Sequence, residues 1–222
     1  MKRILITIIL LGFVGGATAQ QYPTRTVTVV VPFPAGSATD QVARVLAPQW
    51  QESLGRSFVI YNKAGALASI GTMEAAKSAP DGYTIALATN TTHAANVALF
   101  KKLPYDPVKD FAPIIRTTTV PTVLVVSPDS PAHTLKAFID YAKAKSGTLT
   151  SGYWSSGSQV PIAKLKARAG FSTVDAAYKG SPATLSDIMG GHISFTFVDL
   201  TNALPQIQGG KLKGLGVTSL KR

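Results

Sequence analysis

Short apolar runs rich in β-branched residues alternate with segments of helical periodicity along most of the chain. The run Val27–Val31 is uninterrupted, which is typical of a strand buried on both faces. Apolar residues then recur at helical spacing from Val42 to Leu54, and Gly55 is placed to end this helix. The other expected elements of this half are strands at residues 58–61 and 83–88 and a helix at residues 69–78. The order β-α-β-α-β predicts a parallel sheet with helices on both faces.

The alternation resumes after a turn-rich segment at residues 103–111. Strands are expected at residues 114–118, 122–126, 148–153, 174–177, 193–198 and 212–217, and helices at residues 135–144, 159–169, 182–189 and 203–208. We therefore expect two α/β lobes, a first lobe at residues 20–117 and a second lobe at residues 118–222.

The N-terminus has the pattern of a secretory signal peptide at residues 1–19. Lys2 and Arg3 precede an apolar run at residues 4–14, and Ala17-Thr18-Ala19 is an A-x-A cleavage sequence. The alternative, a retained membrane anchor, is disfavoured because a span needs about 20 apolar residues. We expect a periplasmic protein whose mature chain begins at Gln20.

Composition and motifs narrow the function. The chain has no cysteine, so disulfides and thiolate chemistry are excluded. Its formal net charge of +11 suits acidic ligands, but Lys and Arg are scattered and give no nucleic-acid footprint. The sequence has no G-x-S-x-G, G-x-x-x-x-G-K-[ST], H-E-x-x-H or EF-hand motif, and His93, His133 and His192 are isolated. We expect no enzyme activity, no cofactor and no metal.

Two hydroxyl-rich loops that each open a helix at the end of a strand are candidates for ligand binding. In the first, Gly36 permits close backbone approach and Ser37 can cap the helix that follows, so exposed N–H groups would favour an anion. We expect Gly36, Ser37 and Thr39 to donate to one end of a carboxylate, and Ser155, Ser156 and Ser158 of the second loop to donate to groups facing the second lobe. The alternative is that these are ordinary capped loops, with Asp40 a cap rather than a partner for a ligand ammonium group. Lys179 and Asp199 follow two other strands. The candidate ligand-binding residues are Phe33, Ala35, Gly36, Ser37, Thr39, Asp40, Ser155, Ser156, Gly157, Ser158, Lys179 and Asp199.

As a set, several segments resemble the Bug family of extracytoplasmic solute receptors, which serve tripartite tricarboxylate transporters. They are the sequences VPFPAG at residues 31–36, PDGYT at 80–84, LPYDPVKDF at 103–111, YKG at 178–180, MGG at 189–191, ALP at 203–205 and GKL at 210–212. The resemblance implies a two-lobed periplasmic-binding-protein (Venus-flytrap) fold that closes on a small carboxylate between the two loops, with backbone N–H groups and bridging waters as ligand contacts. It also implies membrane transporter subunits as partners.

Three features depart from the family pattern. Ser37 stands where a second glycine is usual, and residues 62–68 (NKAGALA) replace two glycines of a glycine-rich stretch. The chain also stops at Arg222 where family members continue, so we expect the first lobe to lack its C-terminal return.

The pattern favours a receptor that captures a dicarboxylate, tricarboxylate or amino-acid-like compound for a secondary transporter. The alternatives are a periplasmic sensor that reports ligand occupancy to a signalling kinase, and a small hydrolase, for which no motif supplies a nucleophile and base.

Overall fold

The apolar run near the N-terminus forms β1 (Val27–Val31), the central strand of a three-stranded sheet, in a computed structural model that describes residues 21–220. The strand order is β2-β1-β3, with β2 at Phe58–Asn62 and β3 at Thr84–Ala86, and both pair parallel to β1. The predicted parallel sheet is confirmed.

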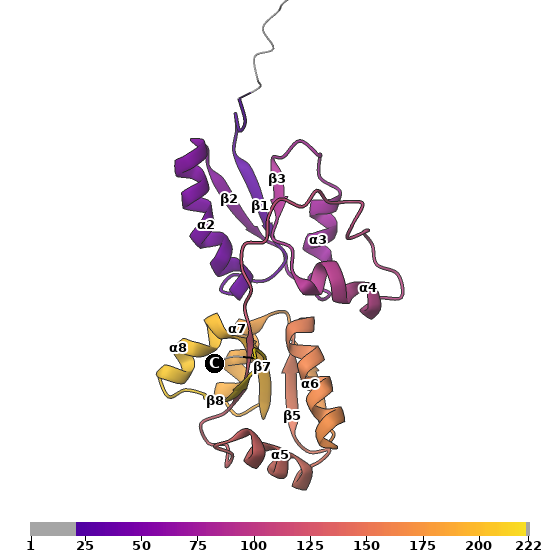
Figure 1. Ribbon diagram of the computed structural model, residues 1–222, viewed down its shortest axis with the longest axis vertical. Coiled ribbons are helices and arrows are strands. Elements are labelled where there is room, and N and C mark those ends of the chain that lie inside the picture. Colours follow the sequence, from indigo (N-terminus) through magenta and orange to yellow (C-terminus); the bar gives the residue numbers. More distant parts are fainter. Residues whose placement is uncertain (1–20, 221–222) are drawn as a thin grey trace, which may run out of the picture.

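Two helices follow the first two strands, as the periodicity indicated. Helix α2 (Ala38–Leu54) ends at Gly55, whose φ of 69° is left-handed, and α3 (Ser69–Ala76) follows β2. The two helices lie to either side of the sheet (Figure 1). A short π-helix, η1 (Thr91–Ala95), continues into α4 (Asn96–Leu99), and neither was predicted.

A second, five-stranded sheet occupies the C-terminal half, in the order β6-β5-β7-β4-β8. Its strands are β4 (Thr122–Val126), β5 (Thr150–Tyr153), β6 (Val174–Ala177), β7 (Phe195–Asp199) and β8 (Lys213–Val217). Its helices are α5 (Leu135–Ala144), α6 (Ser156–Ala169), α7 (Ser181–Met189) and α8 (Leu200–Gln208). Strand β5 pairs parallel to β6 and β7, whereas β4 runs antiparallel to β7 and β8, so this sheet is mixed.

The strand expected at residues 114–118 is wrong. This segment has no regular structure, and Ile114 and Ile115 are each 80% exposed. An apolar run becomes a strand only where a neighbouring strand accepts its hydrogen bonds, and here the chain is passing from one sheet to the other. We call the part around the three-stranded sheet the N-terminal lobe and the part around the five-stranded sheet the C-terminal lobe (Figure 1).

Apolar packing joins the two lobes. One cluster of buried residues includes Val31 and Phe33 from the N-terminal lobe and Val123, Trp154 and Ile188 from the C-terminal lobe. A second cluster lies within the C-terminal lobe, where the rings of Phe138, Phe171 and Phe195 meet edge to face. The lobes are therefore closed on each other along a partly apolar boundary.

Across residues 21–220, we find no helix with the length and apolar character that crossing a membrane requires.

Candidate functional site

The first loop (residues 33–40) connects the central strand β1 to helix α2 at the boundary between the lobes. Phe33 is buried and anchors the loop in the shared apolar cluster. Gly36 has a φ of 79°, a left-handed conformation that favours glycine, and it turns the chain toward the helix. Ser37 is the N-cap, and its Oγ accepts a hydrogen bond from the N–H of Asp40 at 3.2 Å. The predicted capping role of Ser37 is confirmed.

Asp40 lies on the inner side of this loop, with only 1% of its surface exposed. One carboxylate oxygen accepts from the N–H of Gly36 and from Arg44 Nε, both at 2.8 Å, and the other accepts from Asn62 Nδ2 at 2.9 Å. Burial alone would raise the pKa of Asp40, but these hydrogen bonds from Arg44, Gly36 and Asn62 outweigh it and hold the pKa below its usual value. Asp40 thus holds the loop in shape, and its charge is already paired.

The hydrogen bonds of the loop determine which N–H groups are left for a ligand. The N–H of Gly36 donates to Asp40, and that of Ser37 donates to the carbonyl of Pro34 at 3.1 Å. These two main-chain N–H groups are therefore engaged within the loop, and the expectation that Gly36 and Ser37 donate to a carboxylate stays a prediction. Within residues 21–220, the N–H groups of Ala38 and Thr39 in the first turn of α2 have no acceptor. These two are the donors that the helix N-terminus offers.

The second loop (residues 154–158) connects β5 to α6 in the C-terminal lobe. Helix α6 begins at Ser156, three residues earlier than predicted, so the last three of the five loop residues belong to its first turn. Ser158 Oγ accepts from the N–H groups of Trp154 and Ser155 at 3.1 and 3.3 Å, which folds the loop back on the helix. The N–H of Gly157 has no acceptor in the described part of the chain. This N-terminus, too, offers a free donor.

Contacts between the lobes lie at both loops. On one side, Thr91 Oγ1 at the start of η1 lies 2.8 Å from Ser156 Oγ and accepts from the N–H of Ser156 at 3.2 Å. On the other side, Asn202 Nδ2 of α8 donates to the carbonyl of Gly36 at 2.9 Å. In Figure 1, α4 lies above α6, and the lower end of α2 lies above α7 and α8. The two helix N-termini therefore open onto the boundary between the lobes.

Sequence reasoning missed Thr91 and Asn202. A signal existed for Thr91, because the polar run Asn90-Thr91-Thr92 follows β3 just as the first loop follows β1. No signal existed for Asn202, which lies within a helix whose spacing indicated only an amphipathic segment.

Two further candidates lie near the site without hydrogen bonds that tie them to it. Lys179 is exposed in the turn before α7. Asp199 ends β7 opposite Thr122, and its side chain has no hydrogen bond to another described residue. Burial raises the pKa of Asp199 above its ordinary value, against a smaller opposing effect of its own N–H.

Behind the first loop, residues 65–68 have an unusual backbone. Ala66, Leu67 and Ala68 have φ values of 45°, 51° and 66°, a left-handed region that costs non-glycine residues roughly 1–2 kcal/mol each. Leu67 and Ala68 occupy the positions where the resemblance led us to expect glycine. The stretch is tied down by Asn96 Nδ2, which donates to the carbonyl of Leu67 at 3.0 Å. Its strain is held by the surrounding structure.

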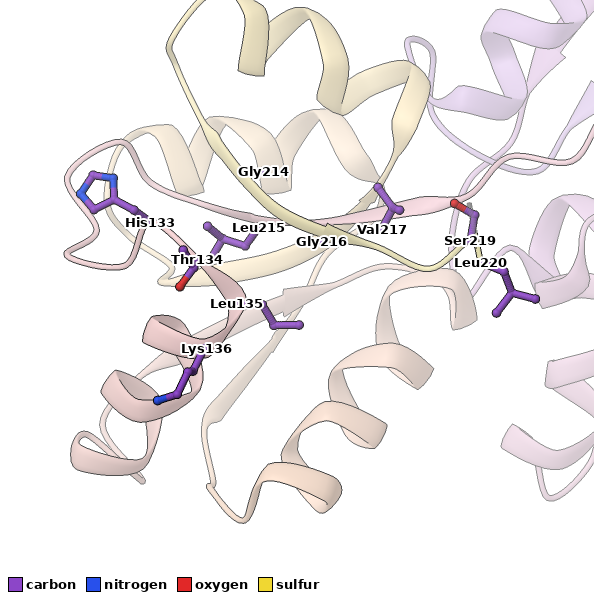
Figure 2. Close-up of a pocket in the computed structure, with 10 residues that line it drawn as sticks. All are labelled: His133, Thr134, Leu135, Lys136, Gly214, Leu215, Gly216, Val217, Ser219 and Leu220. Atoms are coloured by element: carbon purple, nitrogen blue, oxygen red, sulfur yellow. The ribbon is translucent and has the colours of Figure 1, made fainter. Parts of the chain in front are cut away.

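Of two hollows in the described part of the chain, one adjoins a candidate loop and the other does not. A groove of about 760 Å³ lies between η1 and α6, and its lining includes Asn90, Ser156, Gly157, Val120 and Thr122. It is continuous with the second loop. The hollow in Figure 2, of about 600 Å³, lies against β8 and the start of α5 and contains none of the candidate residues. The side chains of His133 and Lys136, two of its polar lining residues, point in different directions (Figure 2).

The chemistry available at the boundary is recognition of an anion. Free N–H groups at two helix N-termini carry partial positive charge and favour carboxylate oxygens. Among residues 21–220 there is no cluster of three or more His, Cys, Asp or Glu side chains that could hold a metal ion. The donor set suits a small carboxylate held by main-chain groups.

Comparison with known proteins agrees with this geometry. The family model described as the tripartite tricarboxylate transporter family receptor matches residues 42–222. The chain belongs to this receptor family. The resemblance to Bug receptors inferred from the sequence is thereby confirmed.

Named relatives of the receptor family cover nearly the whole chain. Protein BugT of Bordetella pertussis is 35% identical over 214 residues, which are 95% of this chain and 66% of BugT. This chain thus spans about two thirds of the length of the curated relatives it matches.

Solved structures of receptors establish the fold. An R. palustris protein with adipate is 34% identical, with a TM-score of 0.88 over 90% of this chain and 68% of that one. MatC of Rhodopseudomonas palustris with bound malate is 32% identical, with a TM-score of 0.85 over 90% of this chain and 69% of that one. The two-lobed periplasmic-binding-protein fold expected from the sequence is confirmed.

Proposed function

We propose that this protein is a receptor that captures a small carboxylate between its two lobes and releases it unchanged. The observation that carries the proposal is the pair of helix N-termini, from α2 and α6, which lie at one boundary with the free N–H groups of Ala38, Thr39 and Gly157. Each belongs to a different lobe, so a carboxylate compound bound by both would stabilise the closed form over the open one. Two solved relatives carry adipate and malate, which are compounds of this class.

The proposal also covers the cellular location of the protein and the membrane proteins that it serves. Residues 1–19 would be removed on export to the periplasm, and the closed receptor would deliver its ligand to the membrane subunits of a tripartite tricarboxylate transporter. We propose the lobe boundary near residues 117–118, in the extended connection between the sheets. Mass spectrometry of the periplasmic protein tests the export step, with a chain beginning at Gln20 expected and an intact Met1 contradicting it.

Ligand binding is tested by thermal unfolding in the presence of a panel of carboxylic acids that includes adipate and malate. A compound at 100 times its Kd should stabilise the protein by about 2.7 kcal/mol. No stabilisation by any member of a broad panel would contradict the proposal. Incubation with the bound compound should return it chemically unchanged, and turnover would contradict a receptor without chemistry.

Proline variants test whether the free main-chain N–H groups bind the carboxylate. Thr39→Pro and Gly157→Pro each remove one free N–H at the second position of a helix, a position that Pro182 already occupies in α7. Both should lose most of the stabilisation by the carboxylate. Lys136→Pro at the same position of α5, away from the boundary, is the matched control and should keep it. Equal retention in all three variants would place the ligand elsewhere.

A further inference from the structure

We propose that Asn202 is a positioning residue that couples closure of the lobes to the shape of the first loop. The inference rests on the proposed function, because it concerns how the carboxylate site is completed. Asn202 lies in α8 of the C-terminal lobe with 8% of its surface exposed, 166 residues from Gly36 in the sequence. Its side chain nevertheless contacts the N-terminal lobe at two points.

Both ends of the Asn202 amide are used across the boundary. Nδ2 donates to the carbonyl of Gly36 at 2.9 Å, and Oδ1 accepts from Gln41 Nε2 at 3.0 Å. Gln41 lies in the first turn of α2, and its Nε2 also approaches the Gly36 carbonyl at 3.3 Å. One asparagine thus bridges the loop and the helix that the loop opens.

The Gly36 residue is consequently held from both lobes. Its N–H is held within the N-terminal lobe by Asp40, at 2.8 Å, and its carbonyl is held by Asn202 from the other lobe. When the lobes separate, the bond to Asn202 is lost, and the longer bond from Gln41 Nε2, at 3.3 Å, is the one that the N-terminal lobe itself supplies to this carbonyl. Closure therefore completes the restraint on the loop whose next residues, Ala38 and Thr39, carry the free N–H groups.

Asn202 is itself oriented by its own lobe, and the boundary around it is tight. Nδ2 also donates to Ser181 Oγ at 3.2 Å. Next to Ser181, Gly180 packs against Pro34 so closely that a β-carbon at this glycine would lie 2.5 Å from Pro34 Cγ. The φ of Gly180 is 179°, an extended conformation open to any residue, so the glycine is required by the approach of the lobes.

The test measures lobe separation directly. Because the chain has no cysteine, cysteines introduced at exposed Gln51 in α2 and exposed Lys143 in α5 give a single pair of spin-label sites, one on each lobe. The distance distribution is measured with and without adipate or malate. Gly180→Ala should shift it to longer distances, and Gly216→Ala, whose β-carbon would meet only Leu135 at 4.0 Å, should leave it unchanged. Gly180→Ala thus gives the reference distance distribution for separated lobes, and Gly216→Ala gives the one for closed lobes.

Asn202→Asp is the decisive variant, because it keeps the size and the acceptor of the side chain but replaces the donor to Gly36 by a carboxylate oxygen. It should shift the distribution toward that of Gly180→Ala and weaken carboxylate binding about tenfold, the value of one hydrogen bond. Ser181→Ala removes a partner of Asn202 within its own lobe, where Thr201 Oγ1 also donates to Asn202 Oδ1 at 3.3 Å, and should leave the distances unchanged. Restored closure in Asn202→Gln would further support the donor role.

The inference is overturned if Asn202→Asp has the distance distribution of the parent while Gly180→Ala opens the lobes. It is also overturned if Ser181→Ala shifts the distances as far as Asn202→Asp, since the effect would then arise within one lobe. Distances without ligand test this inference alone, whereas the response of the parent protein to carboxylates tests the proposed function. The two can fail separately.

Discussion

The carboxylate of Asp40 accepts a hydrogen bond from the main-chain N–H of Gly36 at 2.8 Å, inside the turn that leads from β1 to α2. The same buried group also accepts from Arg44 and Asn62. A candidate ligand contact is therefore a structural anchor, and it leaves the adjoining N–H groups of the helix free for an anion.

Replacing Asp40 by asparagine should destabilise the protein and weaken carboxylate binding. An amide accepts weaker hydrogen bonds than a carboxylate and places an NH2 group against donors, so we expect a loss of about 2 kcal/mol in the free energy of unfolding. Denaturant unfolding measures it. Asp140→Asn, which breaks an exposed ion pair with Lys136, is the control and should change stability little. Equal effects of the two substitutions would show that the Asp40 network contributes no more than a surface pair.

The contribution of Asp40 should depend on pH in a defined direction. Its pKa is lowered in the folded protein, so the stabilisation is fully present above the unfolded value near pH 4 and is lost as the pH falls through the folded pKa. The difference in stability between the parent and Asp40→Asn should therefore shrink on acidification below about pH 4. A difference that grows in acid would reverse the sign of the effect.

Removing the N-cap of α2 should lower both stability and carboxylate binding, whereas removing the N-cap of α5 should lower stability alone. Ser37→Ala and Thr134→Ala each delete a side-chain oxygen that accepts from the third N–H of a helix, at 3.2 and 3.1 Å. Each should lower the free energy of unfolding by about 1 kcal/mol. Only Ser37→Ala, at the boundary between the lobes, should also weaken carboxylate binding, as isothermal titration can measure. Unchanged binding in Ser37→Ala would make this loop purely structural.

Asp199→Asn should stabilise the protein at neutral pH. Burial raises the pKa of Asp199, so stability from this group is present below the unfolded value near pH 4 and is lost as the pH rises through the folded pKa. At pH 7 the variant avoids burying a charge and should melt at a higher temperature than the parent, with the gain vanishing in acid. Asp129→Asn on an exposed turn is the control. A lower melting temperature at pH 7 would mean that the carboxylate has a partner that stabilises it.

Replacement by glycine should be tolerated better in the left-handed stretch at residues 66–68 than at a position inside a helix. Ala66 is exposed with a φ of 45°, so Ala66→Gly relieves strain of roughly 1–2 kcal/mol against a loss of about 0.5–1 kcal/mol from the freer unfolded chain. The net effect should be between neutral and about 1.5 kcal/mol stabilising. Ala163→Gly, at an exposed position inside α6, should instead cost about 1 kcal/mol. Similar losses at both positions would show that Ala66 is unstrained.

Most elements could be predicted because their signals are local. Val27–Val31 is apolar at every position, as a strand covered on both faces must be, and it is the central strand of its sheet. Ser37 and Gly55 bound α2 because a hydroxyl satisfies an N–H at one end and a left-handed glycine ends the other. The position of both candidate loops at strand ends followed from the same reasoning.

Periodicity failed where structure depends on a neighbour. Residues 114–118 have the composition of a strand but no partner, and β4 runs antiparallel to β7 and β8 although nothing in its apolar pattern encodes direction. The alternation of elements indicated two α/β lobes, and the family resemblance supplied the periplasmic-binding-protein arrangement of those lobes.

Chain composition and pattern were thus enough to place hydroxyl-rich helix starts at two strand ends and to favour an anion as ligand. Tertiary structure decided which donors are free, because Asp40 and Pro34 take the N–H groups of Gly36 and Ser37. It also decided that Asn202 meets Gly36 across 166 residues of sequence. A hydrogen bond acts only over about 3 Å, so contacts between lobes exist only once both lobes are folded and closed.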